Sequence, residues 1–296
     1  MAELRVGFIG FGEVASTFAK QMTKAGAEVW AYDVLLSQRD GLKTIRKRAG
    51  IEKIEIHSLE EVCRACRYLL STVTTHKARD AAASAARYIK RNHVYIDLNS
   101  TSPAVKTDIG NIIRSAGAHF VEAAILGAIG TAGHRACILT SGEKGKEVSE
   151  LLNQLGLNVS FYSTEIGKAS MFKMLRSILS KGIECILLEF LVAGKRAGIG
   201  KDLWEDITRY FSETSFEKAA SNWIQTHPAA CERRHHEMLQ VIETMREIGV
   251  DPIMTSATEG FFGRSLSLEI QTAFPGKPAS PDNVVDFLGS AQRIPN

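Results

Sequence analysis

A glycine-rich segment near the start of the chain has the residue types and spacing that bind dinucleotide phosphates. Gly10, Gly12 and Ala15 match the pattern G-x-G-x-x-G/A and directly follow the apolar run Val6–Ile9. The first glycine permits a tight turn, the second leaves room for a pyrophosphate, and the small third residue lets the next helix pack closely on a strand. The free N–H groups at that helix start favour negative charge. We assign the phosphate contacts to Gly10, Gly12, Glu13 and Val14.

An acidic residue stands where the adenosine ribose of such a dinucleotide would lie. A second strand pattern, Glu28–Tyr32, ends at Asp33. Its carboxylate is placed to accept hydrogen bonds from the ribose hydroxyls. A 2′-phosphate there would meet like charge, and apolar residues rather than an arginine follow directly. We therefore predict NAD as the preferred cofactor, with NADP as the alternative because Arg39 lies a few residues further on.

A long apolar segment, residues 168–197, carries the side chains best suited to proton transfer. Lys173 and Ser177 share one face of the predicted helix. Near a nicotinamide, the Lys173 ammonium could polarise a carbonyl or exchange a proton during hydride transfer, and burial would lower its pKa toward a useful range. The same lysine could instead extend from the first turns of the helix into solvent. The residues alone leave both roles open.

Polar residues also follow two further predicted strands, residues 68–73 and 93–97. The carboxyl ends of strands line the ligand crevice of an open parallel sheet. Thr72, Val73 and Thr74 are therefore predicted cofactor contacts, although the threonines could instead cap the next helix. Asn99 and Ser100 form a second polar cluster at such an edge.

These residues are positioned by two kinds of element. Strand and helix patterns alternate from Arg5 to about Tyr162, and only helical patterns follow, at 202–211, 214–225, 229–248 and 252–266. We expect an α/β fold, with a Rossmann domain (1–165) built on a doubly wound parallel sheet and an all-helical domain (166–296). Apolar residues cover nearly every side of the helix 168–197, which predicts that it is buried. A partner subunit would help to cover it, so we expect a homodimer or a dimer of dimers.

Composition excludes several classes of function. The chain has 296 residues and a formal charge of +3, which gives no argument for nucleic-acid binding. No apolar run is long enough to span a bilayer, so we expect no membrane partner. The five cysteines, an odd number without a secretory signal, lead us to expect a cytoplasmic protein. Cys63 and Cys66 are interpreted as ordinary thiols, the basic cluster 233–236 early in a helix as a solvated face, and no metal site is predicted.

Three motifs together resemble the β-hydroxyacid dehydrogenases, which include 3-hydroxyisobutyrate and 6-phosphogluconate dehydrogenases. They are the glycine pattern, the segment Asp97–Pro103 (D-x-x-[ST]-x-x-P), and Gly167 followed by Lys173 on the long helix. The resemblance implies that Lys173 is the catalytic lysine. It also implies substrate contacts from Asn99, Ser100, Gly127, Arg176 and Ser177.

The chain departs from this family at several positions. Asn99 replaces a serine of the substrate loop, Leu126 replaces a serine that binds the substrate carboxylate, and Arg176 and Ser177 replace two asparagines. The variant helix sequence, Lys173–Ser177 followed by Lys181 and Gly182, and the segment Glu232–Met238 resemble a poorly characterised, phosphogluconate-dehydrogenase-like branch. We expect a nicotinamide-dependent oxidoreductase acting on a small hydroxyacid or its carbonyl partner, anionic because Arg176 and Lys181 lie nearby. Imine reduction and a non-catalytic dinucleotide-binding regulator are the alternatives.

Overall fold

The chain forms two compact units, which we describe separately. The structure is a computed structural model that describes residues 4–50 and 54–291. The first unit is Met1–Ile178 and the second is Leu179–Asn296. The division falls inside one long helix, α8 (Lys168–Arg196). The boundary predicted after residue 165 stays a prediction, because α8 itself belongs to both units.

The first unit is built on one sheet, whose strand order in the described chain is β3-β2-β1-β4-β5-β6-β7-β8. The strands are β1 (Arg5–Ile9), β2 (Glu28–Tyr32), β3 (Ile54–Ile56), β4 (Tyr68–Ser71), β5 (Val94–Asp97), β6 (His119–Leu126), β7 (Cys137–Ser141) and β8 (Asn158–Ser163). The first six in this order run parallel, with the arrangement of a Rossmann fold. The expected doubly wound sheet is confirmed. Its last two strands differ, since β7 runs antiparallel to β6, and β8 is parallel to β7.

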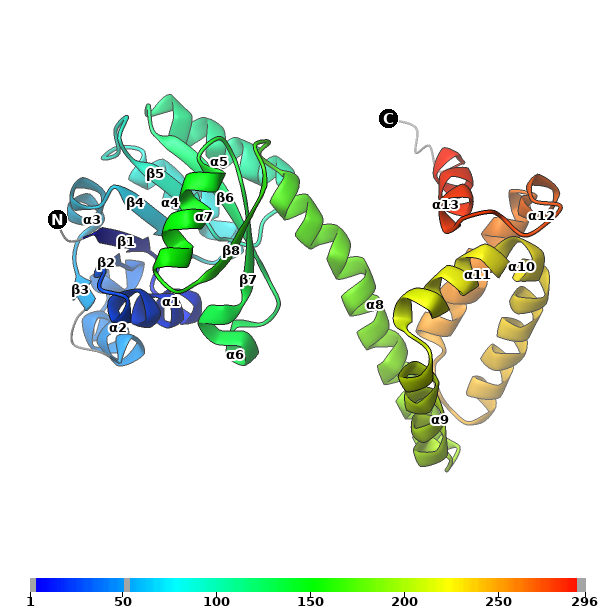
Figure 1. Ribbon diagram of the computed structural model, residues 1–296. Helices are drawn as coiled ribbons and strands as arrows, with labels where there is room; N and C mark the ends of the chain where they lie inside the picture. Colours follow the sequence, from blue (N-terminus) through cyan, green and yellow to red (C-terminus); the bar gives the residue numbers. More distant parts are fainter. Residues whose placement is uncertain (1–3, 51–53, 292–296) are drawn as a thin grey trace. The chain divides into compact units, whose positions relative to one another are not determined.

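Helices cover both faces of this sheet, as Figure 1 shows. They are α1 (Glu13–Lys24), α2 (Gly41–Ala49), α3 (Leu59–Ala65), α4 (Ala78–Ala85), α5 (Pro103–Ser115), α6 (Ile129–Ala132) and α7 (Gly145–Gln154). Alternate strand residues enter two separate cores. Phe8 of β1 packs in the core that contains Phe18 of α1, and Ile9 packs in the core that contains Ile109 of α5. Burial on both faces explains why these strands are continuously apolar.

The segment after residue 122 differs from what its local sequence suggests. The run of small residues from Ala123 to Gly133 is typical of a loop, but β6 continues to Leu126 and α6 follows. The reason is a tertiary pairing, since residues 122–126 of β6 bond to β7 in antiparallel register. Such pairing can override a local sequence of small residues, which is otherwise typical of a loop.

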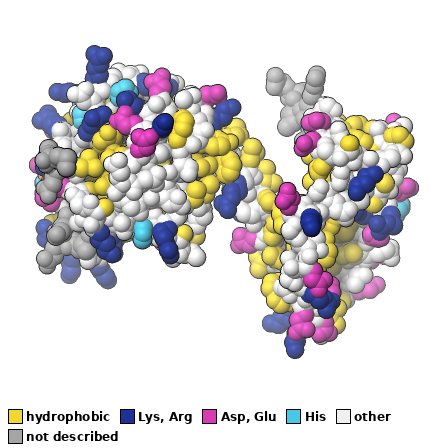
Figure 2. Space-filling model, in the orientation of Figure 1, with side chains coloured by type: hydrophobic (Ala, Val, Ile, Leu, Met, Phe, Trp, Pro, Cys, Tyr) yellow, Lys and Arg dark blue, Asp and Glu magenta, His cyan; other side chains and the backbone are white. Residues whose placement is uncertain are grey.

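Helix α8 has the expected length, but the prediction that it is buried is wrong for the single chain. Leu175, Ile178 and Leu188 are 56%, 71% and 58% exposed. Figure 2 shows hydrophobic side chains on the surface along this helix. The all-round apolar sequence therefore does not correspond to burial within one subunit.

The second unit contains only helices among its described residues. They are the later part of α8, then α9 (Gly200–Glu213), α10 (Phe216–Glu247), α11 (Ile253–Ser267), α12 (Ile270–Ala273) and α13 (Pro281–Ser290). Two helices were predicted at 214–225 and 229–248, but α10 is continuous through the buried Pro228. A proline removes one helical N–H, and packing of α10 along α11 keeps the helix intact. The basic cluster 233–236 thus lies inside α10, so the prediction that it lies early in a helix is wrong.

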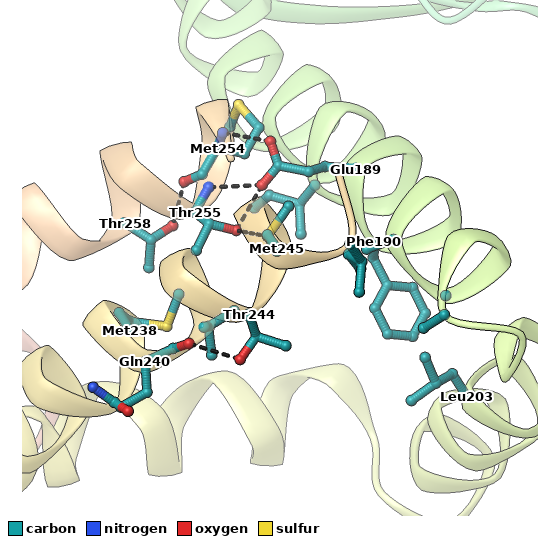
Figure 3. Close-up of a pocket in the computed structure, with 16 residues that line it drawn as sticks. Glu189, Phe190, Leu203, Met238, Gln240, Thr244, Met245, Met254, Thr255 and Thr258 are labelled. Carbon is teal, nitrogen blue, oxygen red and sulfur yellow. Dashed lines mark hydrogen bonds between the residues drawn. The ribbon is translucent and has the colours of Figure 1, made fainter. Parts of the chain in front are cut away.

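One carboxylate joins two helices of the second unit. Glu189 of α8 accepts the backbone N–H groups of Met254 (2.7 Å) and Thr255 (2.8 Å) and the Thr255 hydroxyl (2.6 Å), as Figure 3 shows. Partial burial opposes ionisation of Glu189, but the bonds from Thr255 and Met254 outweigh it and lower the pKa of the carboxyl. The N–H groups at the start of α11 thus find their acceptor on another helix. None of the described helices is long and apolar enough to cross a membrane.

Candidate active site

A cavity of about 560 Å³ in the first unit brings most of the predicted site residues together. It lies where β1, β4, β5 and β6 end, and the start of α8 contributes to it. The predicted residues that line it are Val14, Thr72, Val73, Thr74, Asn99, Ser100, Gly127 and Lys173. Residues widely separated in the sequence therefore share one cavity at the carboxyl edge of the sheet, where ligands bind in such folds.

Lys173 reaches this cavity from the second turn of α8. Its Nζ donates a hydrogen bond to Ser100 Oγ at 2.6 Å. Of the two roles left open for Lys173, the structure thus favours a polar site over simple extension into solvent. An ammonium beside a hydroxyl, at the edge of a half-buried cavity, can hold or transfer a proton to a bound oxygen or nitrogen.

The start of α8 is fixed by a buried acid that the sequence analysis did not single out. Glu122 Oε1 accepts the backbone N–H groups of Gly167 (2.9 Å) and Ala169 (2.8 Å), and Oε2 accepts the Ser170 hydroxyl (3.1 Å). A carboxylate satisfies the unpaired N–H groups of a helix start and suits its dipole. Glu122 therefore sets where α8, and with it Lys173, begins. The signal in the sequence is an acid flanked on both sides by apolar residues, Phe120–Val121 and Ala123–Ile125.

Asn99 is held tightly at the cavity. Its Nδ2 donates to Ser71 Oγ (2.9 Å) and also to Asp97 Oδ1. The side chain is 4% exposed, and its Oδ1 has no hydrogen-bond partner among the described residues. Both amide donors are used, so the orientation of the amide is fixed.

The glycine-rich turn has the geometry that the sequence predicts. Gly10 has φ +87°, and a Cβ there would lie 2.7 Å from Val73 Cγ1 and 2.9 Å from Thr72 O. Gly12 immediately precedes α1, and a Cβ on it would meet nothing within 4 Å. This open space beside a helix N-terminus fits a phosphate. Thr72 Oγ1 donates to Gly10 O (2.7 Å), and Thr74 makes no side-chain cap bond, so the capping alternative is not observed.

Asp33 is 8% exposed and binds backbone on both sides. Its Oδ2 accepts the N–H of Phe11 (2.7 Å), and its Oδ1 accepts the N–H of Leu35 (2.9 Å). The carboxylate thus ties the end of β2 to the glycine-rich turn. Each oxygen keeps a further lone pair for a ribose hydroxyl.

Some predicted residues are not brought to the cavity. Arg176 is exposed on α8, and Ser177 donates its hydroxyl to Lys173 O at 2.9 Å. Neither is among the described residues that line the cavity. Glu13, the first residue of α1, is exposed and outside this lining. Gly10, Gly12 and Asp33 also lie outside the lining, but Gly10 and Asp33 are buried. Gly127 lines the cavity with φ +103°, a conformation that favours glycine.

Comparison with known proteins places the chain in a family. Residues 5–163, more than half of the chain, match the NAD binding domain of 6-phosphogluconate dehydrogenase. The chain belongs to this family. The predicted resemblance is thereby confirmed, as is a domain of the kind that binds a nicotinamide dinucleotide. Residues 195–265 match a second family, a domain of unknown function (DUF1932).

One solved structure and one curated relative agree with this membership, and a second solved structure shares the fold. A conserved protein of unknown function, described as structurally similar to 3-hydroxyacid dehydrogenases, is 32% identical and covers 90% of this chain and 99% of its own, with TM-score 0.61. The rat (Rattus norvegicus) mitochondrial 3-hydroxyisobutyrate dehydrogenase is 25% identical over 67% of this chain, which spans only 59% of that enzyme. An imine reductase from Myxococcus stipitatus shares the fold, with TM-score 0.75, 15% identity, and coverage of 97% of this chain and 100% of its own.

A second cavity, of about 580 Å³, lies in the second unit and contains none of the predicted site residues. Its walls are mainly apolar, and Figure 3 shows Phe190, Leu203 and Met238 among them. Its one carboxylate, Glu189, is already bonded to the start of α11. Among the described residues that line this cavity, the one carboxylate is therefore engaged in holding two helices together.

The thiol groups support the interpretation of Cys63 and Cys66 as ordinary thiols. Cys63 and Cys66 are buried and free, and burial raises the pKa of each thiol to about 12, which makes them unreactive. Within residues 4–50 and 54–291, no group of three or more His, Cys, Asp or Glu could hold a metal ion.

In the basic cluster 233–236, His235 pairs with Glu259 at 2.7 Å and Arg234 donates to Thr226 Oγ1 at 2.8 Å.

Proposed function

We propose that the protein is an NAD(P)-dependent dehydrogenase or reductase that interconverts a small hydroxyacid and its carbonyl partner. The observation that supports this most is the contact between Lys173 Nζ and Ser100 Oγ at 2.6 Å. It lies in a cavity that also contains Val14 and Thr72–Thr74, which belong to the predicted dinucleotide site. A proton-transfer group and a dinucleotide-binding segment thus share one cavity.

The residues around the glycine-rich turn fit the cofactor. Gly12 and the start of α1 would hold the pyrophosphate, and Asp33 would accept the ribose hydroxyls. When bound, the nicotinamide supplies or accepts the hydride. Asp33 also anchors the turn through Phe11, so the carboxylate that selects the ribose stabilises the phosphate-binding loop as well.

Lys173 would handle the proton at the substrate oxygen. In reduction it donates a proton to the oxygen of the carbonyl, and in oxidation it accepts the hydroxyl proton. Ser100 holds the ammonium in place and presents its own hydroxyl to the same substrate atom. The basis for an anionic substrate is that the cations Arg176 and Lys181 follow Lys173 in the sequence of α8, although both are exposed.

Imine reduction is the second candidate, because Leu126 stands where the resembled dehydrogenases have a carboxylate-binding serine. Leu126 is a half-buried apolar residue at the end of β6 and offers no hydrogen-bond donor in its side chain. A substrate without a carboxylate would not need a hydrogen-bond donor at this position. The fold shared with the imine reductase is compatible with this reading.

A second copy of the chain is the partner that we propose. The exposed apolar residues of α8, including Leu175, Ile178 and Leu188, form a continuous run along one helix. Contiguous exposed apolar surface of this extent is typical of an interaction site. A homodimer or dimer of dimers would cover it.

The test is turnover of NADH and NADPH by the purified protein with carbonyl acids and imines, and of NAD and NADP with hydroxyacids. We expect turnover of a hydroxyacid–carbonyl pair, and we expect Lys173→Ala to lower its rate strongly. Turnover of imines alone would favour the second candidate. Tight cofactor binding without turnover of any compound would indicate a regulator and contradict an enzymatic function.

A further inference from the structure

A buried ion pair lies directly behind the cavity loop. Lys106 of α5 and Asp97, the last residue of β5, are 2.7 Å apart, and their side chains are 1% and 0% exposed. Lys106 Nζ also donates to the carbonyl oxygens of Asp97 (2.9 Å) and Asn99 (2.7 Å). All three ammonium protons are therefore used.

This arrangement is unfavourable as a device for stability alone. Removing a lysine and an aspartate from water costs several kcal/mol per ion, and well-packed apolar residues of similar volume are often at least as stabilising. The pair does, however, fix the backbone. It holds the carbonyls of residues 97 and 99, and Asp97 Oδ1 accepts the Asn99 amide in addition. The loop that begins at Asn99 is thus held by both its backbone and its side chain.

Ser100 is the next residue of this loop, and its Oγ accepts the bond from Lys173. We propose that Lys106 is a positioning residue, which acts through the backbone of Asn99 to set where Ser100 meets Lys173. Lys106 is buried behind the loop and is not among the described residues that line the cavity, so its effect on the site passes through the loop. The inference rests on the proposed function only in that it gives Ser100 and Lys173 a role in proton transfer.

The proposal predicts that the titration midpoint of Lys173 depends on both Ser100 and Lys106. This dependence can be measured without any substrate. Lysine amines labelled with ¹³C-methyl groups report their titration midpoints by NMR, and the Lys173 signal is assigned by its absence in Lys173→Arg. Loss of a hydrogen bond from an ammonium lowers its pKa. We expect Ser100→Ala and Lys106→Met each to lower the Lys173 midpoint by about one unit. In the Ser100→Ala background, Lys106→Met should cause no further shift.

A matched control is Lys144→Met. Lys144 belongs to the same unit and pairs with Glu147 at 2.7 Å, but the pair is partly exposed. The Lys144→Met substitution should leave the Lys173 titration midpoint unchanged. The proposal is overturned if Lys106→Met also leaves the midpoint unchanged, or if it shifts the midpoint equally with and without Ser100.

A single change leaves Asp97 buried without its cation, so Lys106→Met could fail to fold. The variant Lys106→Met with Asp97→Leu removes both charges, and apolar replacement of a buried pair preserves stability in other proteins. We expect this variant to fold and to show the same lowered Lys173 midpoint. A folded double variant with the wild-type midpoint would contradict a positioning role. Because the measurement needs no turnover, an inactive protein with the predicted coupling would contradict the proposed function but not this inference.

Discussion

Glu122 Oε1 accepts the backbone N–H of Ala169, 47 residues further along the chain, at 2.8 Å. This single bond joins the middle of the sheet to the helix that carries Lys173. The same oxygen also accepts the N–H of Gly167, whose φ of +99° places the chain for the turn into α8. The position of the candidate catalytic lysine thus depends on a carboxylate that is itself fully buried.

We predict that Glu122→Ala lowers the free energy of unfolding by about 3 kcal/mol, because it leaves buried N–H groups without an acceptor. Glu122→Gln keeps one acceptor oxygen, so its free energy of unfolding should fall by less. Urea denaturation measures both. Glu143→Gln, at an exposed position, is the control and should stay within about 0.5 kcal/mol of wild type. A Glu122→Ala protein as stable as this control would show that the start of α8 does not need the carboxylate.

The second prediction concerns the choice of cofactor. The Asp33 carboxyl group accepts backbone N–H groups on both oxygens. A 2′-phosphate would meet this negative charge, so we expect kcat/KM to favour NAD over NADP by about tenfold or more, or roughly 1.4 kcal/mol. Steady-state kinetics with both cofactors tests it. A preference for NADP that disappears in Arg39→Ala would mean that Arg39 reaches the phosphate and that the prediction is wrong.

The third prediction concerns acid stability. The folded-state pKa of Glu189 is lowered, so ionised Glu189 adds stability above its unfolded pKa of about 4.3. That contribution is lost as pH falls through the lowered folded value. Glu189→Gln should be less stable than wild type at neutral pH, and the difference should shrink in acid. Urea denaturation across this pH range measures it. A difference that does not depend on pH would exclude the charge of Glu189 as the cause.

The fourth prediction concerns assembly. The exposed Ile178 and Leu188 of α8 should be covered by a second copy of the chain. Light scattering at micromolar concentration should give a dimer or tetramer, and Leu188→Asp should shift it toward monomer because an unpaired charge would be buried. Asp substitution at the exposed Leu42 of α2 is the control and should leave the mass unchanged. A stable wild-type monomer would contradict this prediction.

How much of the fold could be predicted from the sequence depends on whether the interactions that form each element are local or join segments far apart in the chain. The turn from β1 through Gly10 and Gly12 into α1 is local, and its elements were predicted almost residue by residue. The extension of β6 depends on pairing with β7, and the continuity of α10 through Pro228 depends on packing with α11, so neither could be read from a local pattern.

The candidate site shows the same limit. Lys173, Asn99 and Ser100 were identified from their types and their places after strands or on a helix, and the structure brings them together. Arg176 was expected to contact the substrate because of the resemblance to the dehydrogenase family, but its side chain is exposed. Lys106 gave no signal, because a lysine on an amphipathic helix is normally solvated. Only the fold shows that it enters the interior beside Asp97.

The last prediction concerns Lys173. If it transfers the proton, Lys173→Ala should lower kcat by about 10²–10⁴-fold, or roughly 3–5 kcal/mol of barrier, and leave cofactor affinity nearly unchanged. Lys173→Arg should rescue little, because a guanidinium does not release a proton near neutral pH. The measurements are kcat and the cofactor Kd of both variants. If Lys173 only fills space beside Ser100, Arg would substitute well and Ala would mainly reduce stability. Activity of Lys173→Ala within a few-fold of wild type would exclude Lys173 from proton transfer.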